Sequence, residues 1–207
     1  DHSVTAGEGL RYFVDNFSRV DTTPNAVVID RDGETLFDLE DADLSKLFEA
    51  GYEYPEAFGV KSADGVTDIY GVIYKPFDFD PSKKYPIVAY VYPGPQTESV
   101  AKAFRTSPSE VALAQLGMIV ITIGNRGGNP ARSKWYHNYG YGDLRDYGLA
   151  DKKAGIEQLA DRHAWIDIDR VGIYGHSGGG FMSTAAMLVY PDFFKVAVSS
   201  SGNHNND

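Results

Sequence analysis

Short apolar runs separated by polar or glycine-rich segments dominate the chain from about residue 57 onward. The runs at 57–60, 69–74, 87–92, 118–123, 171–174 and 196–199 are rich in Val, Ile and Tyr, which predicts strands. Segments at 110–116, 144–162 and 181–189 have helical spacing, and Leu149, Ile156 and Leu159 share one face of the second. Apolar strands alternating with helices predict an α/β fold with a mostly parallel sheet and helices on both faces.

Two smaller patterns refine this picture. The runs at 57–60 and 69–74 flank the turn at 63–65 and are expected to pair antiparallel, and 124–138 is expected to be a glycine-rich loop. In the first 40 residues, runs at 11–14 and 26–30 suggest strands, and the turn at 31–33 suggests a hairpin. A short helix is expected over 41–50, capped by Asp43 and closed by Gly51.

Composition and charge exclude several classes of function. The net charge of −10 over 207 residues argues against nucleic-acid binding, and no apolar run approaches 18 residues, so no membrane span is expected. The chain has no cysteine, and its histidines, at 2, 137, 163, 176 and 204, lack metal-ligand spacing. We therefore expect neither a metal nor a cofactor. The chain shows no signal-peptide pattern and opens at Asp1, as expected for a processed or cloned segment.

Ser177 is the strongest candidate for chemistry. It lies in Gly-His-Ser-Gly-Gly at residues 175–179, between an apolar strand and a predicted helix. Strand, G-x-S-x-G and helix form the signature of a nucleophile elbow, a sharp turn that exposes the serine hydroxyl and requires glycine two positions away. The alternative is a glycine-rich turn without chemistry. Phosphate and dinucleotide loops are excluded, because Phe181 and Ser183 stand where those motifs need lysine and glycine.

Four segments occur together in the order seen in one peptidase family. They are KKYPIV at 83–88, VYPGP at 91–95, NRGG at 125–128 and GHSGGG at 175–180. With them the chain resembles the prolyl oligopeptidase family of serine peptidases, most closely its dipeptidyl peptidase IV branch. The resemblance implies that residues 1–40 are the C-terminal remnant of a β-propeller. It implies that residues 41–207 are the N-terminal part of an α/β-hydrolase domain lacking its C-terminal portion.

Tyr92 is the candidate for one oxyanion donor. Pro93 has no backbone N–H, so it cannot supply the backbone donor that α/β-hydrolases often use after this strand. A side-chain donor is then needed; the Tyr92 hydroxyl is protonated at neutral pH, and the resemblance implies this role for it. The alternative is a tyrosine that only packs its ring. The other donor is expected to be the backbone N–H of Gly178.

Further polar and aromatic residues surround these candidates. Arg126 either positions substrate or, as we favour, forms a structural ion pair within its loop. His176 is expected to point away from the nucleophile and to pack rather than to act as a base. Tyr136, Tyr139 and Tyr141 are expected to pack in the core or at a domain interface.

A serine nucleophile also needs an acid and a histidine, which follow it in that order in α/β-hydrolases. Only a helix, a strand and a tail follow Ser177, whereas a further parallel crossover needs about 30 residues. Asp192 precedes the last strand, at the wrong end of the sheet, and His204 comes too early in the order. We therefore expect the triad Asp and His to lie outside this chain. The chain is expected to be a fragment cut at both ends, and to be inactive alone.

The resemblance implies that the parent protein is a serine exopeptidase that hydrolyses peptides through an acyl-enzyme on Ser177. An esterase or acylaminoacyl peptidase of the same fold is one alternative. A non-catalytic hydrolase-fold binding module is another, against which the retained serine argues. Implied partners are a peptide substrate and the missing β-propeller and C-terminal hydrolase segment, while a homodimer of the parent stays open. A secreted or periplasmic location is expected from the family.

Overall fold

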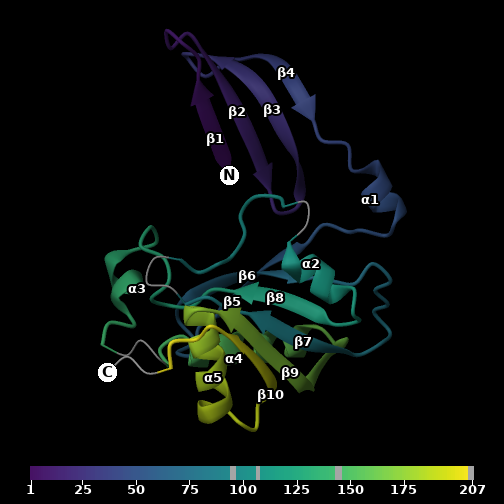
Figure 1. Ribbon diagram of the computed structural model, residues 1–207, viewed down its shortest axis with the longest axis vertical. Coiled ribbons are helices and arrows are strands. Elements are labelled where there is room, and N and C mark those ends of the chain that lie inside the picture. The colour runs from purple at the N-terminus through teal and green to yellow at the C-terminus, as the bar shows by residue number, and fades with distance from the viewer. Residues whose placement is uncertain (94–96, 106–107, 143–145, 205–207) are drawn as a thin grey trace.

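The computed structural model describes residues 1–93, 97–105, 108–142 and 146–204, which form two β-sheets (Figure 1). The first sheet is antiparallel and contains β1 (His2–Ala6), β2 (Tyr12–Arg19), β3 (Thr22–Asp30) and β4 (Thr35–Asp41) in sequence order. Helix α1 (Ser45–Glu49) follows it. Four antiparallel strands in a row match the blade of a β-propeller, as the resemblance implied.

The turn between β3 and β4 confirms the predicted hairpin. Gly33 has a φ of 89°, in the left-handed region that favours glycine. The Asp30 carboxylate accepts the backbone N–H groups of Asp32 and Glu34, each at 2.9 Å. Strand β1 was not predicted, because its polar residues break the apolar pattern.

The second sheet is mixed and positions the candidate site. It contains β5 (Glu56–Lys61), β6 (Asp68–Tyr74), β7 (Tyr85–Tyr90), β8 (Ile119–Ile123), β9 (Ile166–His176) and β10 (Phe194–Ser200). The spatial order is β10-β9-β7-β8-β6-β5, and β7 to β10 run parallel. β5 and β6 form the predicted antiparallel pair at one edge. The mostly parallel sheet of an α/β-hydrolase fold is confirmed.

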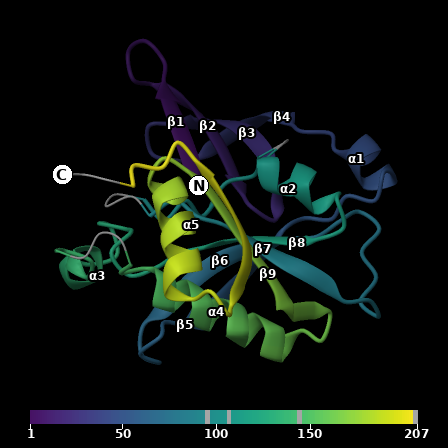
Figure 2. The ribbon, with the colours of Figure 1, turned by 60° about the horizontal axis from the view of Figure 1, so that its bottom comes forward.

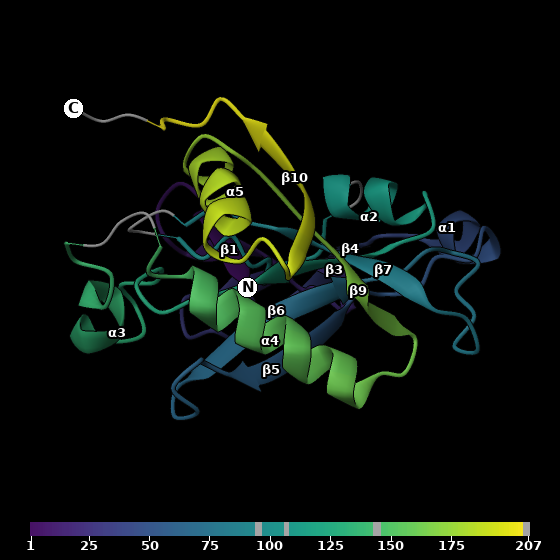
Figure 3. The same cartoon turned by 90° about the horizontal axis from the view of Figure 1, so that it is seen from below.

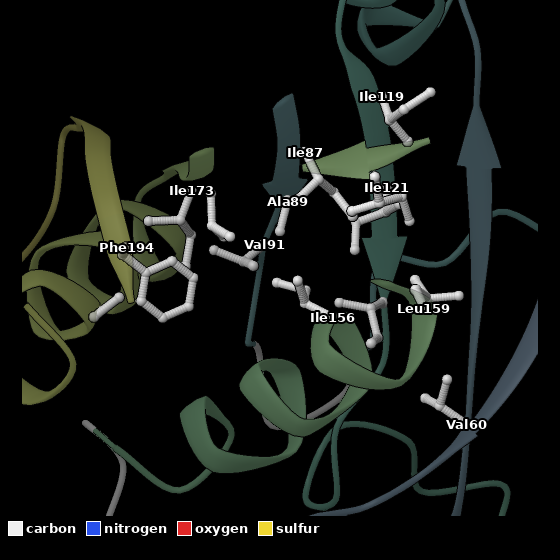
Figure 4. Close-up of a cluster of buried hydrophobic side chains, with 14 of the residues drawn as sticks. Val60, Ile87, Ala89, Val91, Ile119, Ile121, Ile156, Leu159, Ile173 and Phe194 are labelled. Atoms are coloured by element: carbon white, nitrogen blue, oxygen red, sulfur yellow. The ribbon is translucent and has the colours of Figure 1, made fainter. Parts of the chain in front are cut away.

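Helices cover both faces of this sheet. α2 (Ser109–Ala114) lies on one face, and α4 (Leu149–Arg162) and α5 (Gly178–Val189) lie on the other (Figure 2, Figure 3). Ile156 and Leu159 of α4 meet the apolar side chains of β7 and β8 in the main core (Figure 4). Both are completely buried, as is Leu149, so the predicted apolar face of α4 is confirmed.

Three predictions about helices were wrong. A helix, α3 (Lys134–Asn138), lies within the segment expected to be a loop, and the Ser133 hydroxyl caps it by accepting the Tyr136 N–H at 3.0 Å. Helix α4 starts at Leu149 rather than at 144, and residues 144–145 lie outside the described part. Helix α5 starts at Gly178 rather than at 181, because the glycines of the elbow already have helical geometry.

Helix α1 is shorter than the predicted 41–50. Its N-cap is Leu44, not Asp43. The Asp43 carboxylate instead accepts the Ser45 N–H at 2.9 Å, in a turn that starts one residue too early to cap the helix. Gly51 closes the helix as predicted, with a φ of 92°.

Candidate active site

Ser177 forms the turn between β9 and α5. Its φ of 55° and ψ of −118° place a non-glycine residue in a conformation that costs about 1–3 kcal/mol. Its N–H donates to the Ser200 carbonyl at 2.8 Å, and its carbonyl accepts the Phe181 N–H at 3.0 Å. The side chain is partly exposed, and within the described residues no hydrogen bond engages its hydroxyl. The predicted sharp turn is present; the role of Ser177 as nucleophile stays a prediction.

The glycines around Ser177 are required by close packing against the end of β7. A Cβ at Gly175 would lie 2.4 Å from the Val91 carbonyl oxygen, and one at Gly179 would lie 2.0 Å from the same atom. Gly180 similarly faces the Ser200 carbonyl, at 2.6 Å from a built Cβ. The sequence explained these glycines by the serine turn alone. Their contacts also bring three strand ends together at one point.

Tyr92 and Gly178 both lie beside this junction. Tyr92 follows β7, and its Cα would be 3.5 Å from a Cβ on Gly179. Its ring is partly exposed. Gly178 is the first residue of α5, so its N–H has no partner within the helix and lies at the positive end of the helix dipole. Both proposed oxyanion donors therefore flank the turn, and their roles stay predictions.

A cavity of about 470 Å³ opens beside the turn. It is lined by Pro93, Gly127, His137, Gly140, Tyr141, Gly142, Tyr147, Gly178, Phe181 and Asn203. The Tyr147 ring packs on two glycines, because a Cβ at Gly127 or at Gly140 would come within 2.5 Å of it. The Tyr147 hydroxyl donates to the Pro93 carbonyl at 3.4 Å, and burial raises its pKa. This arrangement fixes one aromatic wall next to the candidate nucleophile.

Arg126 forms a structural ion pair, as favoured from the sequence, but its partners lie outside its own loop, contrary to the prediction. Its side chain is only 4% exposed and meets the fully buried Asp151 through Nε at 2.9 Å and a terminal nitrogen at 2.6 Å. It also contacts Asp64 and stacks on Tyr139. Burial alone would lower the pKa of Arg126, but the hydrogen bonds and charge of Asp151 raise it above its usual value. The network joins the loop after β8 to α4 and to the β5–β6 turn.

Some side-chain predictions need correction. His176 is exposed and shares a hydrogen bond with the Ser200 hydroxyl at 3.1 Å, so it does not pack as expected. Of the three tyrosines, only Tyr136 is buried. Tyr139 lies over Arg126, and Tyr141 is 87% exposed at the cavity rim, because α3 projects from the body of the protein.

The nominal triad candidates lie as the sequence indicated. Asp192 precedes β10, at the sheet edge opposite Ser177. His204 follows β10 and shares a hydrogen bond with the Ser199 hydroxyl at 3.3 Å. In the described part of the chain, no hydrogen bond joins Ser177 to either residue.

The described ranges contain neither a metal-binding group nor a membrane-spanning helix. No group of three or more His, Asp, Glu or Cys side chains there is placed to hold a metal ion. None of the helices described has the length and apolar character needed to cross a membrane.

Sequence reasoning missed the cavity wall formed by His137 and Tyr147. Neither residue belongs to a motif, and each lies far from Ser177 along the chain. The available signal was the pair Gly127 and Gly140, because glycine can mark a place where another group approaches the backbone closely.

Comparisons with known proteins agree with this fold. The model of the prolyl oligopeptidase family matches residues 104–207. Human dipeptidyl peptidase 8 is 38% identical over 156 residues, which cover 72% of this chain and 17% of that protein. A protein of Emericella nidulans provisionally named dipeptidyl-aminopeptidase B is 32% identical over 191 residues, 88% of this chain and 20% of that protein.

A solved structure gives a similar result. The crystal structure of a Bacteroides ovatus protein, provisionally named a dipeptidyl aminopeptidase IV, superimposes with a TM-score of 0.84 at 32% identity. The match covers 98% of this chain and 29% of that one. The chain therefore spans less than a third of the length of these relatives.

A mostly parallel sheet with a strained serine between strand and helix defines the class of α/β-hydrolases. Within that class, the chain belongs to the prolyl oligopeptidase family of peptidases.

Proposed function

We propose that Ser177 is the nucleophile of a serine peptidase that releases dipeptides from the amino terminus of peptides. The observation that carries the proposal is the strained Ser177, whose hydroxyl lacks a partner in the described residues and whose neighbour Gly178 lines the cavity. Release of dipeptides is inferred from the names of the relatives, because none of the described residues is shown to set the length of the released product.

In the proposed reaction, the Ser177 oxygen attacks the carbonyl carbon of the scissile peptide bond. The negative charge that develops on the carbonyl oxygen accepts hydrogen bonds from the Gly178 N–H and the Tyr92 hydroxyl. A histidine from elsewhere in the parent chain takes the serine proton and passes it to the leaving amine. Water then hydrolyses the ester on Ser177 and regenerates the hydroxyl.

The proposed partner for the open side of the sheet is the C-terminal hydrolase segment of the same polypeptide. An apolar cavity of about 650 Å³ lies over β7, β9 and β10 beside α2. Val196 and Val198 of β10 are 57% and 60% exposed there, unusually high for alternating valines of a parallel strand. The relatives contain several times more chain than this segment, which is enough to cover the face and to supply the triad acid and histidine.

The test uses the full-length chain that contains this segment. A fluorophosphonate probe is expected to label Ser177, and a dipeptidyl anilide is expected to be hydrolysed; Ser177→Ala should abolish both. Hydrolysis of esters but not of anilides would favour an esterase. An unreactive serine in a folded protein would support a binding module and overturn the proposal. The segment alone, residues 1–207, is expected to show no turnover.

A further inference from the structure

The imidazole of His137 is an unused hydrogen-bonding group in the wall of the cavity beside Ser177. His137 lines the cavity together with Pro93 and Gly178. Its Nδ1 is shut off from solvent and has no hydrogen-bond partner in the described part of the chain. Nε2 also lacks a hydrogen-bond partner in the described part of the chain, but it is accessible to solvent. The accessible nitrogen of this cavity-lining ring is therefore Nε2.

The unpaired Nδ1 decides which nitrogen carries the proton. A neutral imidazole has one N–H and one lone pair. A buried N–H without an acceptor is costlier than an unpaired lone pair, and such orphan donors are rare in proteins. The stable neutral tautomer of His137 thus keeps its lone pair on Nδ1 and its proton on Nε2. The cavity wall then presents a hydrogen-bond donor.

The backbone around His137 holds this donor in place. The His137 N–H donates to the Ser133 carbonyl at 2.9 Å, within the capped helix α3. The neighbouring Tyr136 is buried, bonds Glu98 through its hydroxyl, and accepts the Gly127 N–H at 2.7 Å through its carbonyl. The backbone that carries this donor is therefore already ordered before a ligand binds, which lowers the entropy cost of binding.

The Tyr147 hydroxyl in the same wall is already engaged, because it donates to the Pro93 carbonyl. We infer that His137 is a substrate-binding residue, whose Nε2–H donates to a backbone carbonyl oxygen of the peptide held in the cavity. This inference rests on the proposed peptidase function. A peptide carbonyl is the acceptor that every such substrate carries, and the rings of Tyr147 and Phe181 suit the apolar part of the same ligand.

Steady-state kinetics of the full-length chain test the inference. His137→Phe keeps a ring but removes the donor, and it is expected to raise KM for a dipeptidyl anilide by about twofold to tenfold with kcat unchanged. His137→Gln restores an N–H donor and should recover most of the loss. The matched control is His163→Gln, because His163 stacks on Trp165 at the end of α4 and does not line this cavity.

The outcomes separate this inference from the proposed function. If the probe labels Ser177 equally in all variants but KM does not change in His137→Phe, the inference is overturned. A fall in kcat alone would also overturn it, because it would indicate a role in proton transfer. Failure of the wild-type protein to label would instead count against the proposed function. If His137→Phe does not fold, the ¹⁵N NMR spectrum of the wild-type protein labelled with ¹⁵N-histidine tests the inference instead. A proton on Nδ1 of His137 would refute it.

Discussion

Contacts of the neighbouring backbone hold Ser177 in its strained conformation. Its N–H is tied to β10, and its carbonyl starts α5. Gly175 and Gly179 press against the Val91 carbonyl, so the turn cannot relax toward β7. Strain of this kind persists only where the surrounding structure over-determines it. At the scale of single residues, the contacts of the backbone thus leave the serine hydroxyl free for chemistry.

Tyr92→Phe removes one proposed oxyanion donor and little else. In the described residues its hydroxyl has no hydrogen bond, so the thermal midpoint should not change. We expect kcat of the full-length chain to fall by about 10²–10³, the usual effect of losing one such donor. Tyr12→Phe, on the exposed face of β2, is the control. A loss of kcat no greater than in that control would argue that Tyr92 only packs its ring.

Helix α4 anchors the loops of the site through its buried charges. Asp151, in its first turn, accepts the backbone N–H groups of Ala63 and Arg126 as well as the Arg126 side chain. Next to it, the fully buried Lys152 donates to the Ile123 carbonyl at the end of β8, at 2.5 Å. Two adjacent helix residues therefore hold the β5–β6 turn and the loop after β8 in place.

Removing one charge of the Arg126–Asp151 pair should destabilise the fold strongly. Arg126→Met leaves an uncompensated carboxylate in the interior and is expected to lower the free energy of unfolding by about 3–5 kcal/mol in urea titrations. Adding Asp151→Asn should restore part of the loss, because the charge is gone while an acceptor remains. Glu157→Gln, in the exposed pair with Lys153 on the same helix, should cost less than about 1 kcal/mol. Equal losses of unfolding free energy in Arg126→Met and Glu157→Gln would contradict this account.

Because Lys152 is buried, the stability of the protein is expected to depend on pH. Burial lowers its pKa from 10.5 to about 8, although Glu98 and Asp151 oppose the shift. Between pH 8 and 10.5 the unfolded chain holds a proton that the folded chain has released, so stability rises with pH there. Relative to Lys152→Met, the free energy of unfolding of the wild type should rise by on the order of 3 kcal/mol across this pH window. Below the window the difference between the two proteins should not change with pH. Parallel urea-titration curves for the two proteins from pH 7 to 10 would refute the prediction.

Periodicity predicted most elements of the second sheet, because buried strands and the α4 face need continuous apolar positions that are visible in the sequence. It could not predict the order β10-β9-β7-β8-β6-β5, which depends on pairing between distant segments. The Ser177 motif is local, so the sequence revealed it. The cavity wall is not local: His137 and Tyr147 reach the site only through α3 and the packing on Gly127 and Gly140.

At the scale of the whole molecule, the uncovered face of β7, β9 and β10 should control how the isolated segment behaves. Val196, Val198 and Leu116 expose contiguous apolar surface beside α2, of the kind that drives association. The segment is therefore expected to self-associate at micromolar concentrations, and Val196→Lys with Val198→Lys should shift it toward monomer in sedimentation experiments. The control is Val66→Lys, because Val66 is 76% exposed at the distant β5–β6 turn.

The same pair of lysines should have the opposite consequence in the full-length chain. If the C-terminal hydrolase segment covers this face, two buried ammonium groups would have no partners there, and the variant should fail to fold or lose several kcal/mol of stability. Soluble, active full-length protein carrying both lysines would show that the face stays open to solvent. That result would remove the proposed partner while leaving the Ser177 turn and its chemistry untouched.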